Sequence, residues 1–173
     1  TAFLLDNALA HSVTFLAWAA GTMTHWEADL YAGDLPPAQW NQRWWEYVKQ
    51  FQGIEPPATR GENLCDAATK THINDAPAYY HNYAIATVLK YQLHDHIARV
   101  ILKQPPQRCD YAGNRKVGQF LGSLMETGAT EDWRRVLHEA TGEDLSTRAM
   151  IEYYKPLLHW LEVQNQGRHI GWE

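Results

Sequence analysis

Apolar residues recur at helical spacing along most of this chain, and that periodicity constrains the fold more than any other feature. Apolar positions that return every three or four residues predict an amphipathic helix, whereas a half-buried strand would alternate strictly. One helical pattern covers residues 1 to about 32 and predicts one long helix or two joined helices. Another runs from about Tyr79 to Lys103 and ends before Pro105 and Pro106, which cannot continue a helix. The sequence therefore predicts an all-α fold.

Glycine and proline divide the helical pattern into segments. Gly33 is placed to end the first segment, and Pro36 and Pro37 open a helix through WNQRWWEYVKQFQ that stops at Gly53. The further helices that we expect run from Asn114 to Glu126, from a cap at Thr130 to Gly142, and from a cap at Ser146 through a kink at Pro156. The sequence shows no repeat and no domain boundary, so we expect residues 1–173 to form a single helical unit of about six helices.

Composition limits the class of protein. The chain has 173 residues, of which 45% are hydrophobic and 20% charged, with a net charge of -5. These values are typical of one globular domain, and a mildly acidic chain without a basic stripe argues against nucleic-acid binding. The longest apolar stretch, residues 13–23, is too short to span a bilayer, so we expect no transmembrane segment. The two cysteines, Cys65 and Cys109, could form a pair or remain free.

The first residues, TAFLLDNALAH, include neither an initiator Met nor a basic region of the kind that opens a signal peptide. They already lie within the first predicted helix. We therefore expect a fragment of a longer protein or a processed product.

Eight tryptophans are an unusual number for a chain of this size. Tryptophan can present a large flat surface to a ligand, but aromatic residues at helical spacing more often pack in a core. We expect the core to contain most of them.

Two histidine patterns deserve comparison with metal sites. HEATG at residues 138–142 resembles the start of an HExxH zinc helix, but Gly142 occupies the place of the second histidine and predicts an ordinary helix end. His94 and His96 are two residues apart and therefore point in different directions on a helix. The sequence predicts no metal ligands in this chain.

A loop of residues 54–77 leads to KTHINDAPAYYHNY, residues 70–83, which is the richest group of polar side chains. Lys70 and His72 would point the same way if the backbone there is extended. Tyr80 and Tyr83 are three apart at the start of a helix and would share a face. One positive charge, one imidazole and two phenols suit the binding of a carboxylate and the stabilisation of an oxyanion. The alternative is a junction whose polar groups only satisfy one another.

These residues also carry a family resemblance, together with two other segments. The segments are NQRWWEYVKQFQGIEPP at 41–57, KTHI at 70–73, YYHNY at 79–83 and YKPLLHWLEVQNQ at 154–166, with GW close behind. In this order and spacing they resemble the C-terminal part of angiotensin-converting enzyme and its relatives, the peptidyl-dipeptidase A metallopeptidases. The resemblance covers nearly the whole chain and implies the C-terminal portion of a larger, mostly helical zinc peptidase fold.

The resemblance implies a role for each residue of the cluster. Lys70 and Tyr80 would bind the C-terminal carboxylate of a peptide substrate, and His72 would hydrogen-bond the peptide backbone near the scissile bond. Tyr83 would donate its phenol to the oxyanion. The zinc ligands and the general-base glutamate of the family lie upstream, so the isolated chain would be inactive and its partner would be the upstream half of the enzyme. The family also favours a periplasmic or secreted location.

The sequence departs from the family at three positions. If NDAPAYY contains a one-residue insertion, Asn82 replaces one chloride-binding arginine of the family. Val48 stands where the other chloride site has an arginine, after the tryptophan pair, and the two changes together make chloride binding doubtful. Ala98 stands where the family has the cysteine that would pair with Cys109.

The insertion also makes Tyr79 an alternative to Tyr80 as the carboxylate-binding residue, because an alignment without the insertion would choose Tyr79.

Two other functions remain open: a non-catalytic helical module that binds peptides, and a related zinc carboxypeptidase. We also expect that apolar surface left uncovered by the missing part could drive formation of a homo-oligomer.

Overall fold

The computed structural model of the chain describes residues 1–69 and 71–169, with the side chains of residues 12–14 left aside. All regular secondary structure in this part is helical, which confirms the all-α prediction. No helix in the described ranges is both long and apolar enough to cross a membrane.

Contacts between Cα atoms divide the chain into two compact units, residues 2–87 and residues 88–173 with Thr1. Helix α5 (His81–His96) begins in the first unit and ends in the second. Each unit is described by itself below. That residues 1–173 belong to one domain stays a prediction.

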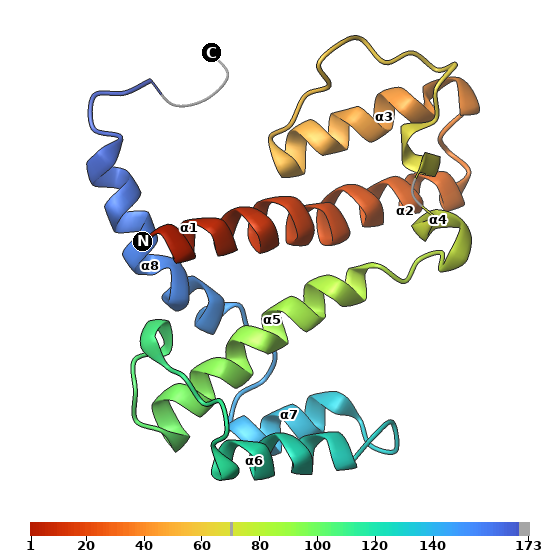
Figure 1. Cartoon of the computed structure of the whole chain (residues 1–173). Helices are drawn as coiled ribbons and strands as arrows, with labels where there is room; N and C mark the ends of the chain where they lie inside the picture. The colour runs from red at the N-terminus through yellow and green to blue at the C-terminus, as the bar shows by residue number, and fades with distance from the viewer. Residues whose placement is uncertain (70, 170–173) are drawn as a thin grey trace. The chain divides into compact units, whose positions relative to one another are not determined.

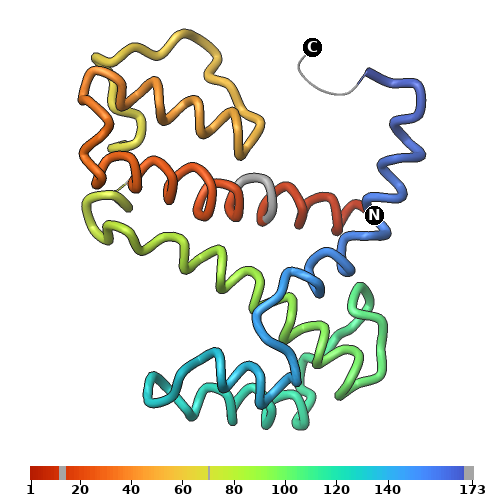
Figure 2. Tube along the Cα trace, turned by 180° about the vertical axis from the view of Figure 1, so that it is seen from behind, coloured from red at the N-terminus to blue at the C-terminus, as the bar shows by residue number. Residues whose placement is uncertain are grey.

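The first unit begins with uninterrupted helix over residues 2–32, as the apolar periodicity predicts. It consists of α1 (Ala2–Asn7), a π-helical stretch (Ala8–Met23) and α2 (Thr24–Ala32). The chain then turns through a 3₁₀ segment (Pro37–Gln39) into α3 (Trp40–Tyr47) and a π-helical end (Val48–Gln52). Gly33 and Gly53 end these helices with left-handed φ values of 79° and 65°, a conformation that glycine adopts without steric cost. Helix α3 packs alongside α2 (Figures 1 and 2).

Tryptophan builds the core of this unit. Trp26 and Trp44 are buried with Met23, and their rings meet edge to face at 5.9 Å. The Trp26 indole Nε1 donates a hydrogen bond to the carbonyl of Trp40 at 2.9 Å, which satisfies its polar atom inside the core. Trp18 and other aromatic side chains pack against this cluster. The tryptophans of the first unit are therefore mainly core residues, as expected.

The segment around His72 differs from its expected extended form. His72–Asp75 forms the short helix α4, and the amides of Asn74 and Asp75 donate to the carbonyl of Thr71 at 2.9 and 2.8 Å. The prediction of an extended backbone at His72 is wrong. A strand must hydrogen-bond to another strand, and the described residues contain none, so this segment satisfies its amides locally.

The second unit contains the rest of α5, with a π-helical extension (Ile97–Ile101), and three further helices. These are α6 (Arg115–Glu126), α7 (Trp133–Thr141) and α8 (Arg148–Gln164). Helices α6 and α7 lie side by side in both ribbon views, and α8 continues through Pro156 (Figures 1 and 2).

Helix caps in the second unit follow the expected chemistry with two corrections. Asp132, not Thr130, caps α7 by accepting a hydrogen bond from the Arg134 amide at 2.9 Å. The Thr130 hydroxyl is already used, because it donates to the carbonyl of Thr127. The N-cap residue of α8 is Thr147 rather than the predicted Ser146, although the Ser146 hydroxyl accepts a hydrogen bond from the Arg148 amide at 3.1 Å.

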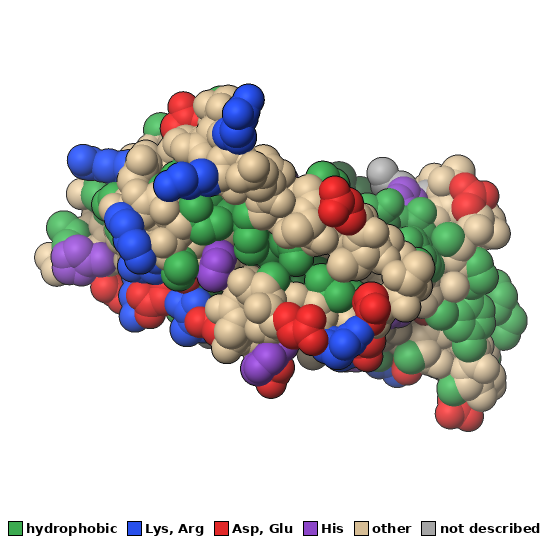
Figure 3. All heavy atoms as spheres, turned by 90° about the horizontal axis from the view of Figure 1, so that it is seen from below, with side chains coloured by type: hydrophobic (Ala, Val, Ile, Leu, Met, Phe, Trp, Pro, Cys, Tyr) green, Lys and Arg blue, Asp and Glu red, His purple; other side chains and the backbone are tan. Residues whose placement is uncertain are grey.

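The surface of the described residues is mixed in character. Acidic and basic side chains are interspersed among apolar ones on the face shown in Figure 3. Several large apolar side chains remain exposed, among them Phe3, Leu9, Met125, Ile151 and Leu158. Cys65 and Cys109 are both free thiols.

Candidate functional site

Three of the four predicted site residues come together in the first unit. The rings of His72 and Tyr80 have centroids 4.2 Å apart, and the rings of Tyr80 and Tyr83 stack at 5.3 Å with an angle of 15° between their planes. The fourth residue, Lys70, lies outside the described residues. Tyr80 and Tyr83 thus share one side at the start of α5, as their spacing predicts.

Two aromatic residues of the first long helix complete this cluster. Trp18 meets the His72 ring edge to face at 5.2 Å and the Tyr80 ring at 5.9 Å. Phe15 meets Tyr83 in the same way at 5.4 Å. Sequence reasoning missed both residues, because aromatic side chains in an amphipathic helix resemble ordinary core residues. Their spacing of three residues was the available signal, since it places both on one face of the helix.

The cluster contains a buried polar atom that has no hydrogen-bond partner in the described part of the chain. This atom is the side-chain nitrogen Nδ1 of His72. Such an atom is costly unless another group can reach it. Desolvation, followed by the neighbouring Tyr83, Asp75 and Tyr79, raises the pKa of Tyr80 from its ordinary value. Like any tyrosine phenol, it is protonated at neutral pH and can donate a hydrogen bond.

The structure also separates the two adjacent tyrosines. Tyr80 is half-buried against His72, whereas Tyr79 is 53% exposed and touches the cluster only through the edge of Tyr80, with centroids 6.1 Å apart. This geometry favours Tyr80 over Tyr79 as the residue that faces a ligand at His72.

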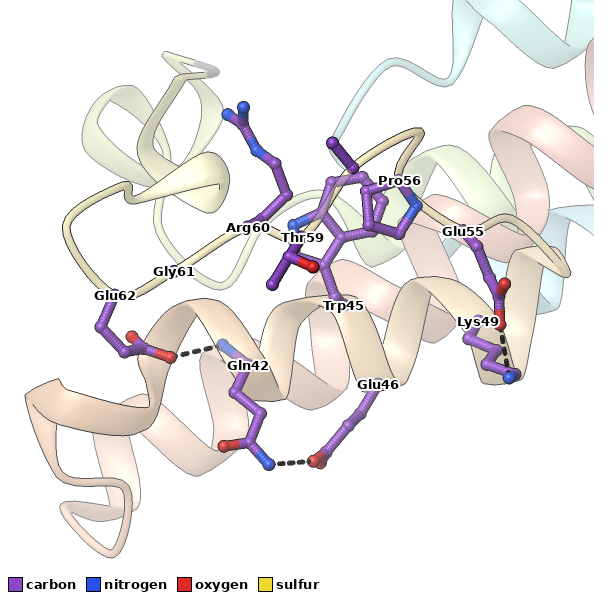
Figure 4. Close-up of a pocket in the computed structure, with 11 residues that line it drawn as sticks. Gln42, Trp45, Glu46, Lys49, Glu55, Pro56, Thr59, Arg60, Gly61 and Glu62 are labelled. Atoms are coloured by element: carbon purple, nitrogen blue, oxygen red, sulfur yellow. Dashed lines mark hydrogen bonds and ion pairs between the residues drawn. The ribbon is translucent and has the colours of Figure 1, made fainter.

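The first unit also contains a hollow that is separate from the His72 cluster. It has a volume of about 730 Å³ and lies between α3 and the loop of residues 55–62, with Trp45 on its wall (Figure 4). The charged groups at its rim are already paired: Lys49 with Glu55 at 2.5 Å, and Glu62 with the backbone amide of Gln42 at 2.7 Å (Figure 4). None of the three described site residues, His72, Tyr80 and Tyr83, lines it.

The described residues do not fit a zinc ion. They contain no group of three His, Cys, Asp or Glu side chains that could hold a metal. His94 donates from Nε2 to the carbonyl of Pro106 at 2.7 Å, whereas His96 stacks on Phe120. The two histidines thus have separate partners.

The HEATG segment also has a structural explanation. Helix α7 ends within it, and Gly142 adopts a left-handed φ of 78° just after the last helical residue, as predicted. His138 pairs through Nδ1 with the carboxylate of Asp144 at 3.0 Å.

The two positions where the sequence lacks an arginine can now be placed. Val48 is 6% exposed and belongs to the tryptophan core, and Asn82 lies in the first turn of α5. Neither side chain carries a positive charge that could hold a buried anion.

Comparison with known proteins identifies the family. Residues 1–172 match the peptidase family M2, described as angiotensin-converting enzyme. The chain is 34% identical to angiotensin-converting enzyme of Theromyzon tessulatum over 98% of its own length, and 32% identical to that of Mesocricetus auratus over 98%. It is also 32% identical over 83% of its length to the angiotensin-converting enzyme-related protein of Drosophila melanogaster.

The same alignments cover only part of each relative. The chain spans 27% of the Theromyzon protein, 13% of the Mesocricetus protein and 24% of the Drosophila protein. Since the family match covers nearly every residue of this chain, the chain belongs to the angiotensin-converting enzyme family of peptidases.

Proposed function

We propose that this chain is the C-terminal helical part of a zinc peptidyl-dipeptidase, which removes dipeptides from the C-termini of peptides. The observation that carries the proposal is the cluster of His72, Tyr80 and Tyr83, whose rings lie together in a member of this peptidase family. The zinc ligands belong, in this proposal, to the part of the enzyme upstream of this chain. The isolated chain would then be inactive.

Each residue of the cluster has a distinct proposed role. Tyr80, with Lys70, binds the free carboxylate of the substrate, for which a protonated phenol and an ammonium group are suitable donors. His72 binds the peptide backbone near the scissile bond through its imidazole ring. Tyr83 donates to the oxyanion that forms when the scissile carbonyl is attacked.

Chloride activation is not part of the proposal. Binding a buried anion requires a compensating positive charge, and Asn82 and Val48 supply none.

Exposed apolar side chains of α8, such as Leu158 at 57% and Val163 at 49%, are proposed to pack against the upstream part of the enzyme.

The test uses the longer protein that carries this chain, with a free peptide and its C-terminally amidated form as substrates. Tyr83→Phe should lower kcat about a hundred- to thousandfold and change KM little, because the oxyanion exists only as the reaction proceeds. Tyr80→Phe should instead raise KM for the free peptide. On the amidated peptide Tyr80→Phe should have almost no further effect, because the carboxylate is gone.

Tyr79→Phe is the matched control and should be nearly silent. A Tyr83→Phe enzyme with the original kcat would contradict the oxyanion role, and a KM defect in Tyr79→Phe would reassign the carboxylate contact.

The two alternative functions give different outcomes in the same assay. A peptide-binding module would bind the free peptide without cleaving it. A zinc carboxypeptidase would release single amino acids, which mass spectrometry distinguishes from dipeptides.

A further inference from the structure

A buried carboxylate lies behind the turn that presents Tyr80. Glu27, in α2, is only 3% exposed. Its Oε1 accepts a hydrogen bond from the backbone amide of Ala78 at 2.9 Å and another from the Tyr31 hydroxyl at 3.3 Å. Since burying a carboxylate is costly unless it is well paired, this group is held in place by what it binds. Its backbone partner belongs to the turn between α4 and α5.

Ala78 has an unusual backbone conformation. Its φ of 57° lies in the left-handed region, which residues with a Cβ rarely adopt. The preceding residue, Pro77, has no amide hydrogen to donate. The bond from the Ala78 amide to Glu27 joins residues 51 positions apart in the sequence and therefore ties the turn to α2. It provides a physical reason for the left-handed conformation to persist.

The conformation of Ala78 controls the two residues that follow it. Tyr79 and Tyr80 directly precede α5, and the amides of Asn82 and Tyr83 donate to their carbonyls at 3.0 Å. A different φ at Ala78 would change the direction in which the chain enters α5. It would thereby change which of the two tyrosines meets His72.

We propose that Glu27 is a positioning residue: by holding Ala78 in its left-handed conformation, its carboxylate selects Tyr80 rather than Tyr79 to face His72. Glu27 touches no substrate in this scheme and acts only through the turn. The effect of Glu27 on substrate binding rests on the proposed function. Its effect on the position of the Tyr80 ring does not.

The first experiment reads the position of the Tyr80 ring directly. The full 173-residue chain is labelled with 3-fluorotyrosine, and its fluorine NMR signals are assigned by single Tyr→Phe changes. The Tyr80 signal should be displaced from that of an exposed tyrosine, because its ring contacts those of His72 and Tyr83. Glu27→Met and Glu27→Gln form a matched pair, since both fill the buried space but only glutamine keeps a carbonyl oxygen as a strong acceptor for the Ala78 amide.

We expect the Tyr80 signal to move toward the exposed position in Glu27→Met and to stay near its original place in Glu27→Gln. Adding Ala78→Gly to Glu27→Met should restore much of the original signal, because glycine adopts a positive φ without the steric cost. Tyr31→Phe removes only the second donor to the same oxygen and should leave the Tyr80 signal unchanged. An unchanged Tyr80 signal in Glu27→Met, or an equal displacement in both variants, would overturn the proposal.

A second measurement needs no variant and so does not depend on how a variant folds. The Ala78 amide of the unaltered chain should exchange with deuterium much more slowly than an exposed loop amide. Exchange at the rate of a free loop would overturn the proposal.

Kinetics of the longer protein separate this inference from the proposed function. Glu27→Met should raise KM for a free peptide by no more than Tyr80→Phe does, about ten- to hundredfold for loss of a charged hydrogen bond. In a Tyr80→Phe background, Glu27→Met should add little. If the protein cleaves no peptide while the fluorine result stands, the proposed function fails and the positioning role survives. If cleavage depends on Tyr80 but not on Glu27, the positioning role fails.

Discussion

Gly21 offers the sharpest test of the packing in the first unit. It lies in the long helix where that helix passes Phe51, and a Cβ added there would lie 2.5 Å from Phe51 Cγ and 2.6 Å from Phe51 Cβ. Ordinary contacts of a Cβ are 3.4–4 Å. Phe51 is itself confined by the rings of His25 and Tyr47, at centroid distances of 4.6 and 5.8 Å. His25 is anchored in turn, because its Nδ1 donates to the Gly21 carbonyl at 2.8 Å.

Two opposing terms set the effect of Gly21→Ala. Replacing a helical glycine by alanine normally stabilises a protein by up to about 1 kcal/mol. Overpacking a well-filled site typically costs about 1–3 kcal/mol. Because Phe51 cannot retreat without moving its neighbours, we expect the second term to win and Gly21→Ala to lower the free energy of unfolding by up to about 2 kcal/mol.

Gly118 is the matched control. It lies in α6, and a Cβ there would meet nothing within 4 Å. Gly118→Ala should therefore raise the free energy of unfolding by about 1 kcal/mol, opposite in sign to Gly21→Ala.

The assay is denaturant unfolding, followed by helical circular dichroism and by tryptophan fluorescence, to which the five tryptophans of the first unit and three of the second contribute. In a Phe51→Gly background all three contacting atoms of Phe51 are absent, so Gly21→Ala should become stabilising. If Gly21→Ala stabilises the chain as much as Gly118→Ala while Phe51 is present, the close contact inferred between Gly21 and Phe51 is wrong.

Three further predictions follow from the polar groups of the described residues. Asn41 is 1% exposed; its side chain accepts from the Asp66 amide at 2.8 Å and donates to the Gly61 carbonyl at 3.1 Å. Asn41→Ala should therefore lower the free energy of unfolding by about 1–3 kcal/mol for each buried group left unpaired. A negligible change in thermal denaturation would contradict this. The hydrogen bond from Arg60, helped by Trp45, holds the pKa of Asp66 well below the usual aspartate range. The ionised Asp66 carboxylate should therefore contribute its full stability above about pH 4 and progressively less as the pH falls further. In Asp66→Asn the free energy of unfolding should decrease less steeply with acidification. Finally, elemental analysis of the dialysed chain should find no stoichiometric zinc, and one tightly held zinc per chain would refute our reading of its ligands.

The sequence by itself determined the helices. Helical periodicity and the positions of glycine specify local backbone hydrogen bonds, which form between residues three to five positions apart and need no distant partner. For this reason Gly33, Gly53 and Gly142 could be identified as helix ends before their left-handed conformations were seen. The same reasoning placed Tyr80 and Tyr83 on one side of α5.

Local rules were insufficient where an alternative local hydrogen bond was available. His72 lies in a short helix rather than in extended backbone, because the described residues supply no neighbouring strand. The Thr130 hydroxyl donates to the carbonyl of Thr127 in the preceding turn, so Asp132 caps α7 instead.

The composition of the cluster was decided by tertiary structure alone. Trp18 packs against His72 from a helix more than fifty positions earlier, and Glu27 binds the Ala78 amide across 51 positions. No periodicity relates residues so far apart, because their contact depends on how whole helices pack. The choice between Tyr79 and Tyr80 likewise follows from a left-handed alanine stabilised by a buried carboxylate, a conformation that no local preference of alanine would select.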